Sequence, residues 1–534
     1  SLDVILFKEA NLNFVRTSHY PPNERFLKFC DRYGIYVESE TACCFVNTYR
    51  QKNYAPGASQ DDPAFEARYL GQLQEEVKVN RVHPSVLMWS IGNESVYGSN
   101  FQKSYDWVKA TDPTRPVIFS YPGSAKEKGA KIYDILSFHY PNWDGNLDQW
   151  GFSTRHFQQG EMPALFDEWA HPACYTYATL QTDPGIREFW GKSIDLMWDG
   201  VFQAPGGLGG AIWCYQDDIF ELPEPKVGTA FWKEFAHTAK PEGYQGKCVG
   251  YGEWGIVDIW RRKKPEFWAA KKACSPVRLL MGKRIQASAG MDLQLTVYNR
   301  FDHTNLKEIR ARYTYLGKTH DLPLPSLEPH QKGILTIPAC DWKDGEHLRI
   351  EFLGSQGELI DQYDPVIGHE RIDYPDLGNG TSLKIEDNST RLVIRGEGFV
   401  IPFDKKTGLI DHAMAGSQVV IDKGPFLNMY VNLNHLSGAE VRKMANHYCT
   451  EDSDWVMESM DYKMRDHGDV EVNVKGHAKG VKGHYQMLIT PKGKVTVSYA
   501  VDGLPNGYLR ETGLKFYLSD AVQKLSWKRR RLED

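Results

Sequence analysis

Short apolar runs alternate with longer amphipathic segments through the first 275 residues of the chain. The strand-like runs are expected at residues 14–17, 35–40, 86–94, 117–121, 135–140, 164–169 and 209–215. Segments with apolar residues at helical spacing lie between them, at residues 23–33, 65–81, 101–111, 186–201 and 265–273. This alternation predicts a parallel sheet with helices outside it, either a (β/α)8 TIM barrel or a doubly wound sheet. A dinucleotide-binding fold is disfavoured because no GxGxxG motif follows a strand.

Polar and aromatic residues gather at the carboxyl ends of these strands. In an eight-stranded barrel that end carries the active site. The run at 86–89 leads into Gly92-Asn93-Glu94, and the run at 163–166 leads into Asp167-Glu168. Two carboxylates at the ends of buried strands are suited to proton transfer at a carbon–oxygen bond. Either glutamate taken alone could instead be a surface residue on a loop between a strand and a helix. The whole set is His19, Tyr20, Glu40, Glu94, His139, Tyr140, Glu168 and Trp213.

The number of strands in the first 275 residues and the change to an all-β pattern after them predict three domains. Seven strands would leave an exposed parallel edge, so we expect a preceding segment of the same protein to supply the eighth. Residues 1–275 are the incomplete barrel. Alternating runs at 286–299, 308–316, 333–337, 347–353 and 359–363 predict an immunoglobulin-like β-sandwich over residues 276–368. Another all-β stretch, with strands at 392–395, 399–403, 471–475, 485–490 and 494–501, predicts a partial β-sandwich over 369–534.

Composition narrows the classes of function. The net charge is −6, from 69 acidic and 63 basic residues, and no basic stripe suggests a nucleic-acid partner. No apolar span of 18 residues suggests a membrane segment. The nine cysteines show no metal-ligand spacing, so we expect neither a metal nor another cofactor. Localisation stays open, and so does assembly into a homo-oligomer.

Several stretches resemble glycoside hydrolase family 2, and most closely its β-galactosidase branch. They are NFVRTSHYPPN at 13–23, DRYGIYVESE at 31–40, RVHPSVLMWSIGNES at 81–95, ALFDEWAH at 164–171, GGAIWCYQDD at 209–218 and GIVDIWRRKKPEFW at 255–268. The order of barrel, sandwich and second sandwich also resembles the family. The family's N-terminal jelly-roll domain and first barrel strand have no counterpart in the sequence.

The resemblance implies retaining hydrolysis of a carbohydrate by double displacement. Glu168 matches the family nucleophile, and Glu94 matches the acid/base. Retention requires the two carboxyl groups to lie about 5–5.5 Å apart. At that distance their repulsion keeps Glu94 protonated until Glu168 is esterified, after which Glu94 can act as the base.

The resemblance also implies a set of substrate-binding residues. Asn93 matches the residue that binds the sugar 2-hydroxyl, and Arg16 matches the arginine that keeps the nucleophile ionised. Each has an ordinary alternative, because Asn93 could be a turn residue and Arg16 a structural ion pair. The remaining members are Tyr140 as a hydrogen-bond donor to the nucleophile, His19 and His171 as galactose contacts, Trp213 as the floor under the sugar, and His139 at its strand end.

Departures from the family pattern leave alternatives open. The positions that hold Mg²⁺ in metal-dependent relatives fall near Cys44 and Val46, so that metal site is expected to be missing. The Asn-x-Lys pair of β-glucuronidases has no match before Arg261, which favours a galactoside. A glucuronidase-like or glucosidase-like specificity and a transglycosidase remain alternatives. In another class, a non-catalytic carbohydrate-binding scaffold also remains.

Overall fold

In the computed structural model of the 534-residue chain, the described residues form two compact units. The first is mainly Ser1–Arg371, and the second is Ile372–His435 with Lys443–Arg530. Among the described residues no helix has both the length and the apolar character that crossing a membrane requires. The described residues are 2–47, 58–120, 131–147, 162–174, 185–221, 248–369, 382–432, 447–465 and 468–524.

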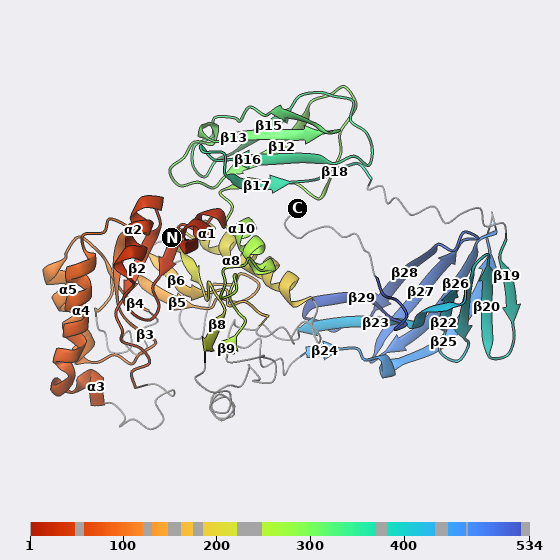
Figure 1. Cartoon of the computed structure of the whole chain (residues 1–534), viewed down its shortest axis with the longest axis horizontal. Coiled ribbons are helices and arrows are strands. Elements are labelled where there is room, and N and C mark those ends of the chain that lie inside the picture. The colour runs from red at the N-terminus through yellow and green to blue at the C-terminus, as the bar shows by residue number, and fades with distance from the viewer. Residues whose placement is uncertain are drawn as a thin grey trace. The chain divides into compact units, whose positions relative to one another are not determined.

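Parallel strands in chain order form the first part of the first unit (Figure 1). Strands β1 to β4 pair in sequence, β5 to β7 pair in sequence, and a parallel bridge from Ile118 to Ile135 joins the two groups. Strands β1 and β7 also approach each other. A doubly wound sheet would reverse its strand order, so this unbroken order is that of a barrel. The strands are β1 (Phe14–Arg16), β2 (Tyr36–Glu40), β3 (Val86–Asn93), β4 (Val117–Ser120), β5 (Leu136–His139), β6 (Ala164–Trp169) and β7 (Gly207–Ile212).

Helices follow the strands, and their ends carry recognisable sequence signals. Helix α2 begins after Asn23, whose side chain accepts a hydrogen bond from the Arg25 backbone, and it ends at Gly34 in the left-handed conformation. A short antiparallel pair, β8 (Asp218–Glu221) and β9 (Cys248–Gly252), follows β7. The helices are α1 (Leu2–Glu9), α2 (Glu24–Tyr33), α3 (Ala58–Asp61), α4 (Glu66–Asn80), α5 (Ser99–Thr111), α8 (Ile186–Gln203) and α10 (Pro265–Ala273).

The interior of the barrel is apolar up to the point where its strands end. Met88, Ile118, Ile135 and Leu165 pack together from neighbouring strands. All six residues of β6 are buried, as are seven of the eight in β3, which is typical of parallel strands covered on both faces. Polar side chains at the ends of these strands are therefore held by a rigid scaffold.

An antiparallel sandwich with its own core follows the barrel within the first unit. The burial of β12 alternates along the strand, because one face packs inward. The predicted strand over 286–299 was too long, since residues 288–291 form a turn around Gly290, whose φ is +74°. One sheet orders β10 (Val277–Leu279), β12 (Leu293–Asn299) and β15 (Lys332–Ile337), another orders β14 (Lys318–Asp321), β13 (Arg310–Tyr315), β16 (Leu348–Leu353) and β17 (Leu359–Tyr363), and β11 (Arg284–Ile285) pairs with β18 (Val366–Ile367).

The second unit is all-β, and its two sheets enclose a third core. Strand β23 is 15 residues long and pairs with β22, β24 and β29. One sheet holds β19 (Lys384–Asp387), β20 (Arg391–Gly396), β21 (Phe399–Asp404), β22 (Leu409–Ala415), β23 (Gln418–Asn432), β24 (His447–Cys449) and β29 (Tyr508–Leu518). The other holds β25 (Trp455–Met464), β26 (Val470–Ala478), β27 (Val481–Ile489) and β28 (Val495–Asp502). The sequence prediction missed β19, β22, β23, β24, β25 and β29.

Candidate active site

The backbone turns sharply where three barrel strands end. Glu94 follows β3 with φ +37°, Tyr140 follows β5 with φ +48°, and Ala170 follows β6 with φ +47°. Side chains other than glycine rarely adopt this region, and such residues are concentrated at functional sites. The lack of a side chain at Gly92 lets the end of β3 pack closely against its neighbours just before Glu94, because a Cβ there would lie 2.9 Å from Phe101 and 3.0 Å from the Cys43 carbonyl. The local backbone thus aims Glu94 and Tyr140 across the end of the barrel.

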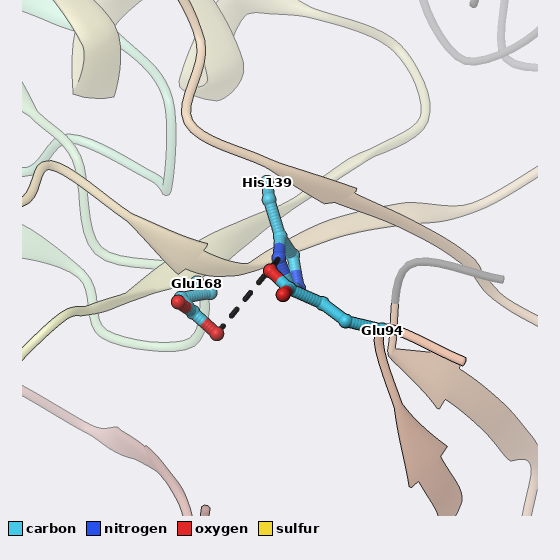
Figure 2. A group of neighbouring side chains, drawn as sticks. All are labelled: Glu94, His139 and Glu168. Carbon is cyan, nitrogen blue, oxygen red and sulfur yellow. Dashed lines mark hydrogen bonds and ion pairs between the residues drawn. The ribbon is translucent and has the colours of Figure 1, made fainter. Parts of the chain in front are cut away.

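Glu94 and Glu168 face each other at this end, with His139 beside them (Figure 2). One carboxylate oxygen of each glutamate and one ring nitrogen of His139 all lie within 4.8 Å of one another. The Glu94 side chain is 24% exposed and that of Glu168 is 8% exposed. One carboxyl group is therefore open to a ligand, while the other lies deeper. So close an approach of one oxygen from each carboxylate favours the spacing of retaining glycosidases over the roughly 6.5–9.5 Å of inverting ones.

Two donors hold the Glu168 carboxylate. Arg16 Nη1 lies 3.1 Å from Oε2, and the Tyr140 hydroxyl donates a hydrogen bond to Oε1. These are the contacts that the resemblance implied for Arg16 and Tyr140. Donors on both oxygens fix the orientation of the carboxylate.

Arg16 connects Glu168 to a wider buried network. Its Nε and Nη2 atoms each lie 2.9 Å from an oxygen of Glu40, and Nη2 donates to Asn93 Oδ1 at 2.7 Å. Burial alone would lower the pKa of Arg16, but the acids around it, Glu40 first, raise it well above its usual value. Ser120 Oγ also donates to Asn93 Oδ1, at 3.2 Å. Asn93 is therefore fully buried and rigidly held next to Glu94.

Aromatic and imidazole rings line the site next to this buried network. Trp213 stacks on His19 with ring centroids 5.1 Å apart and an interplanar angle of 25°. His19 Nδ1 lies 2.9 Å from Glu40 Oε1. His171 packs edge-on against Trp254, with centroids 4.9 Å apart, and lies 6.2 Å from the Tyr140 ring. Flat rings beside polar groups are suited to a sugar, which has apolar faces and a polar rim.

All nine predicted site residues lie in this region. Five of them are buried, namely Arg16, Asn93, His139, Glu168 and His171, and His139 is only 3% exposed. Tyr20, noted among the strand-end residues, is 67% exposed. Nothing in the structure tests which of these side chains contacts a substrate, so their binding roles stay predictions.

A layer of buried acids lies beneath the site; of these, Glu40 was expected at its strand end, whereas Glu38 and the burial of the whole layer were not foreseen. Glu38, Glu40 and Asp167 are each no more than 1% exposed. The signal was present in the sequence, because Glu38 and Glu40 alternate with Ser39 on a short strand, and Asp167 directly precedes Glu168. Burial and the neighbouring Asp167 raise the pKa of Glu38 well above its usual value, which favours its neutral form.

The residues present do not fit the Mg²⁺ site of metal-dependent relatives. Burial raises the pKa of the Cys44 thiol to about 12, so the thiol stays neutral, and Val46 is a buried apolar residue. Mg²⁺ requires oxygen ligands. A cation between Glu94 and Glu168 would have to share Glu168 with the Arg16 guanidinium. We therefore assign no metal ion to these side chains.

A comparison with protein families identifies the barrel. The model of the TIM barrel domain of glycosyl hydrolases family 2 matches residues 1–278, which is more than half of the chain. The chain belongs to glycoside hydrolase family 2. The family match agrees with the observed barrel topology and with the resemblance found in the sequence.

The curated relatives of this family 2 chain include β-galactosidases. The β-galactosidase of Pectobacterium atrosepticum is 28% identical over 344 residues, which cover 63% of this chain and 30% of that protein. The β-galactosidase of Klebsiella pneumoniae is 30% identical over 279 residues, covering 51% and 24%. The chain thus spans less than a third of either relative. A putative β-galactosidase structure from Bacteroides fragilis, 14% identical, covers 69% of this chain and 52% of that one with a TM-score of 0.38, too low to carry an argument.

Proposed function

We propose that the protein is a retaining exo-β-galactosidase that hydrolyses terminal, non-reducing β-galactosyl residues of oligo- or polysaccharides. The observation that carries the proposal is the close approach of Glu94 to Glu168, within 4.8 Å. Family membership sets the reaction class. The specificity for galactose draws its support from the β-galactosidase relatives, which are similar over a part of their length.

The reaction divides into two displacements at one carbon atom. In the first, a Glu168 oxygen bonds to the anomeric carbon while Glu94 donates a proton to the leaving oxygen. In the second, Glu94 removes a proton from water, which displaces the Glu168 ester and frees the sugar with its original configuration. Arg16 and Tyr140, which hold the Glu168 carboxylate, orient the nucleophile for attack.

In this proposal Asn93 and the stacked rings of Trp213 and His19 bind the sugar. The amide of Asn93 stands next to Glu94, where a hydrogen bond to the sugar 2-hydroxyl would strengthen in the transition state. Its Oδ1 accepts from Arg16 and Ser120, which leaves the Nδ2 group, 3.4 Å from Cys44 Sγ, as the donor to a ligand. Trp213, backed by His19, offers an apolar face to the ring.

A panel of nitrophenyl β-glycosides tests this function on the natural full-length protein that contains this chain. The panel holds the galactoside, glucuronide, glucoside, mannoside and fucoside, each assayed with the parent and with Glu168→Gln and Glu94→Ala variants. We expect turnover of the galactoside, loss of activity in Glu168→Gln, and rescue of Glu94→Ala by azide with a β-glycosyl azide product. Preference for another glycoside would overturn the sugar assignment. No turnover of any glycoside would favour a binding scaffold.

A further inference from the structure

The ring of His139 lies against the carboxylate of Glu94 and also faces that of Glu168 (Figure 2). Its Nδ1 atom lies 3.0 Å from Glu94 Oε1 and 3.8 Å from Glu168 Oε2. The ring is at the last position of β5 and is 3% exposed, so it is in direct contact with the pair but shielded from solvent. A buried ring at this place can exchange a proton with Glu94 without meeting bulk water.

A buried aspartate supports the other side of the ring. His139 Nε2 lies 3.5 Å from Asp167 Oδ1 and 2.9 Å from Ser120 Oγ. Asp167 is itself held by Ser137, whose hydroxyl donates to Oδ1 at 2.6 Å. A carboxylate behind a histidine fixes the orientation of the ring and stabilises its protonated form. Asp167, His139 and Glu94 therefore form a continuous line from the interior to the open end of the barrel.

The charges around the ring favour the imidazolium. Burial alone would lower the pKa of His139, but Glu168, Asp167 and Glu94 together raise it to about 10. Glu38 on β2 also interacts electrostatically with the ring, and burial raises its pKa, while the phenol of Tyr140, the next residue, donates to Glu168. Arg16 on β1 approaches the same group of acids from the far side, at Glu168 and at the Asp167 carbonyl.

We propose that His139, oriented by Asp167, is a positioning residue that stores the catalytic proton and exchanges it with Glu94 in both halves of the reaction. This inference rests on the proposed function, because it concerns the acid/base step of that mechanism. It also explains how an acid is available when the His139 ring, 3.0 Å from Glu94 Oε1, carries the proton. His139 and Glu94 share one proton, which stays on the His139 ring until the leaving oxygen of the substrate accepts a proton from Glu94.

The proton balances over the cycle. In the first half, the Nδ1–H bond breaks and an O–H bond forms on Glu94, which passes the proton to the leaving oxygen as the glycosidic bond breaks and Glu168 bonds to the anomeric carbon. The ring is then neutral and Glu94 is ionised. In the second half, water loses a proton to Glu94, its oxygen displaces Glu168, and the proton returns to Nδ1. The imidazolium and both carboxylates are restored.

The His139→Gln variant tests the proposal, because an amide keeps a hydrogen bond but cannot carry the proton. Glu94 alone must then hold the proton, so the alkaline limb of the kcat/KM profile should move to lower pH by at least about one unit. The loss of kcat/KM should be about tenfold or more for a methyl galactoside, which needs a proton on its leaving oxygen. It should be small for a dinitrophenyl galactoside, which does not.

Two further variants keep the test decisive. His83→Gln removes another buried histidine, paired with Asp31 at 2.6 Å outside the site, and should leave both the pH profile and the leaving-group dependence unchanged. Asp167→Asn removes the support of the ring and should move the alkaline limb in the same direction as His139→Gln. If His139→Gln fails to fold, Asp167→Asn decides the question with the same two readouts.

The failure of this inference differs from the failure of the proposed function. An active parent whose His139→Gln variant loses the same factor on both galactosides, with an unmoved alkaline limb, would show that His139 is only structural. A parent that prefers another glycoside is tested with the corresponding methyl and dinitrophenyl glycosides. A parent inactive on every glycoside would overturn the proposed function and this inference together.

Discussion

Arg16 Nη1 lies 3.1 Å from Glu168 Oε2, and both side chains are buried at the end of the barrel. The same guanidinium contacts both oxygens of Glu40 at 2.9 Å. One arginine therefore balances the proposed nucleophile and a second carboxylate that cannot reach solvent. Removing one member of a buried, charged network leaves the others uncompensated, which costs more than the network contributes when it is intact.

The Arg16→Ala variant should lose both stability and activity. We expect the free energy of unfolding to fall by about 3–5 kcal/mol, because Glu40 and Glu168 would remain buried without their cation. Arg16→Lys should retain more stability but lose most activity, since an ammonium cannot reproduce the planar fork of contacts. Urea denaturation and kcat/KM measure the two effects.

An exposed arginine provides the control for Arg16. Arg312 pairs with Glu351 on the sandwich, and its side chain is 43% exposed. Arg312→Ala should change the free energy of unfolding far less than Arg16→Ala does. Equal losses in the two alanine variants would contradict the role assigned to the buried network.

The barrel was largely predictable from the sequence because its strands and helices have different periods. All seven expected strands are present within a few residues, and so are the helices from α2 to α10 that were expected between them. The strand ends then located Glu94 and Glu168, since parallel strands deliver their carboxyl ends to one face. The pairing of the two glutamates across that face follows from topology alone.

The charged layer below the site was not predictable in the same way. Glu38 alternates with apolar Val37 on a short strand, and Asp167 comes at the end of an apolar run, so both positions are expected to face solvent. Their burial depends on Arg16 and His139, which approach from other strands, and such long-range compensation leaves no local pattern. Among the strands missed in the second unit, β29 shows the same limit, because it pairs with β23 over a long distance along the chain.

Glu76 should make stability depend on pH in the direction opposite to that of most carboxylates. Burial raises its pKa to about 8, and Ser39 Oγ lies 2.5 Å from one of its oxygens. The folded state therefore keeps a proton that the unfolded state loses near pH 4.5, and stability falls as pH rises from about 4.5 to 8.

The Glu76→Gln variant tests this pH dependence. The amide cannot ionise, so the free energy of unfolding of the variant should gain on the parent by at least about 1 kcal/mol between pH 5 and pH 8. Glu75, whose side chain is 76% exposed, is the matched control, and Glu75→Gln should run parallel to the parent. Parallel curves for both variants in urea titrations would show that Glu76 ionises normally.

Chelation should leave the catalytic rate unchanged. Cys44 and Val46 stand where metal-dependent relatives hold Mg²⁺, and the neutral thiol accepts a hydrogen bond from Asn93 at 3.4 Å. We expect kcat/KM for the galactoside to agree within about twofold before and after dialysis against EDTA, and on adding Mg²⁺. A large loss that Mg²⁺ restores would show that other residues of the protein complete a metal site.

Trp213 should contribute to sugar binding more than to the chemical step. Its ring is held by the stacked His19, so its face is presented in a fixed orientation. Trp213→Ala should raise KM about tenfold, which corresponds to about 1.4 kcal/mol, with a smaller change in kcat. Trp260, which is 67% exposed, is a suitable comparison, and Trp260→Ala should leave both constants near those of the parent.

The stereochemistry of hydrolysis tests the central claim that Glu94 and Glu168 act as a retaining pair. Proton NMR of nitrophenyl β-galactoside hydrolysis by the full-length protein, recorded before mutarotation, identifies the first anomer released. Because one oxygen of Glu94 and one of Glu168 lie within 4.8 Å of each other, we predict that the β-anomer is released first and then equilibrates slowly to the α-form. Initial release of the α-anomer would mean that water attacks directly, and it would contradict the assignment of Glu168 as the nucleophile.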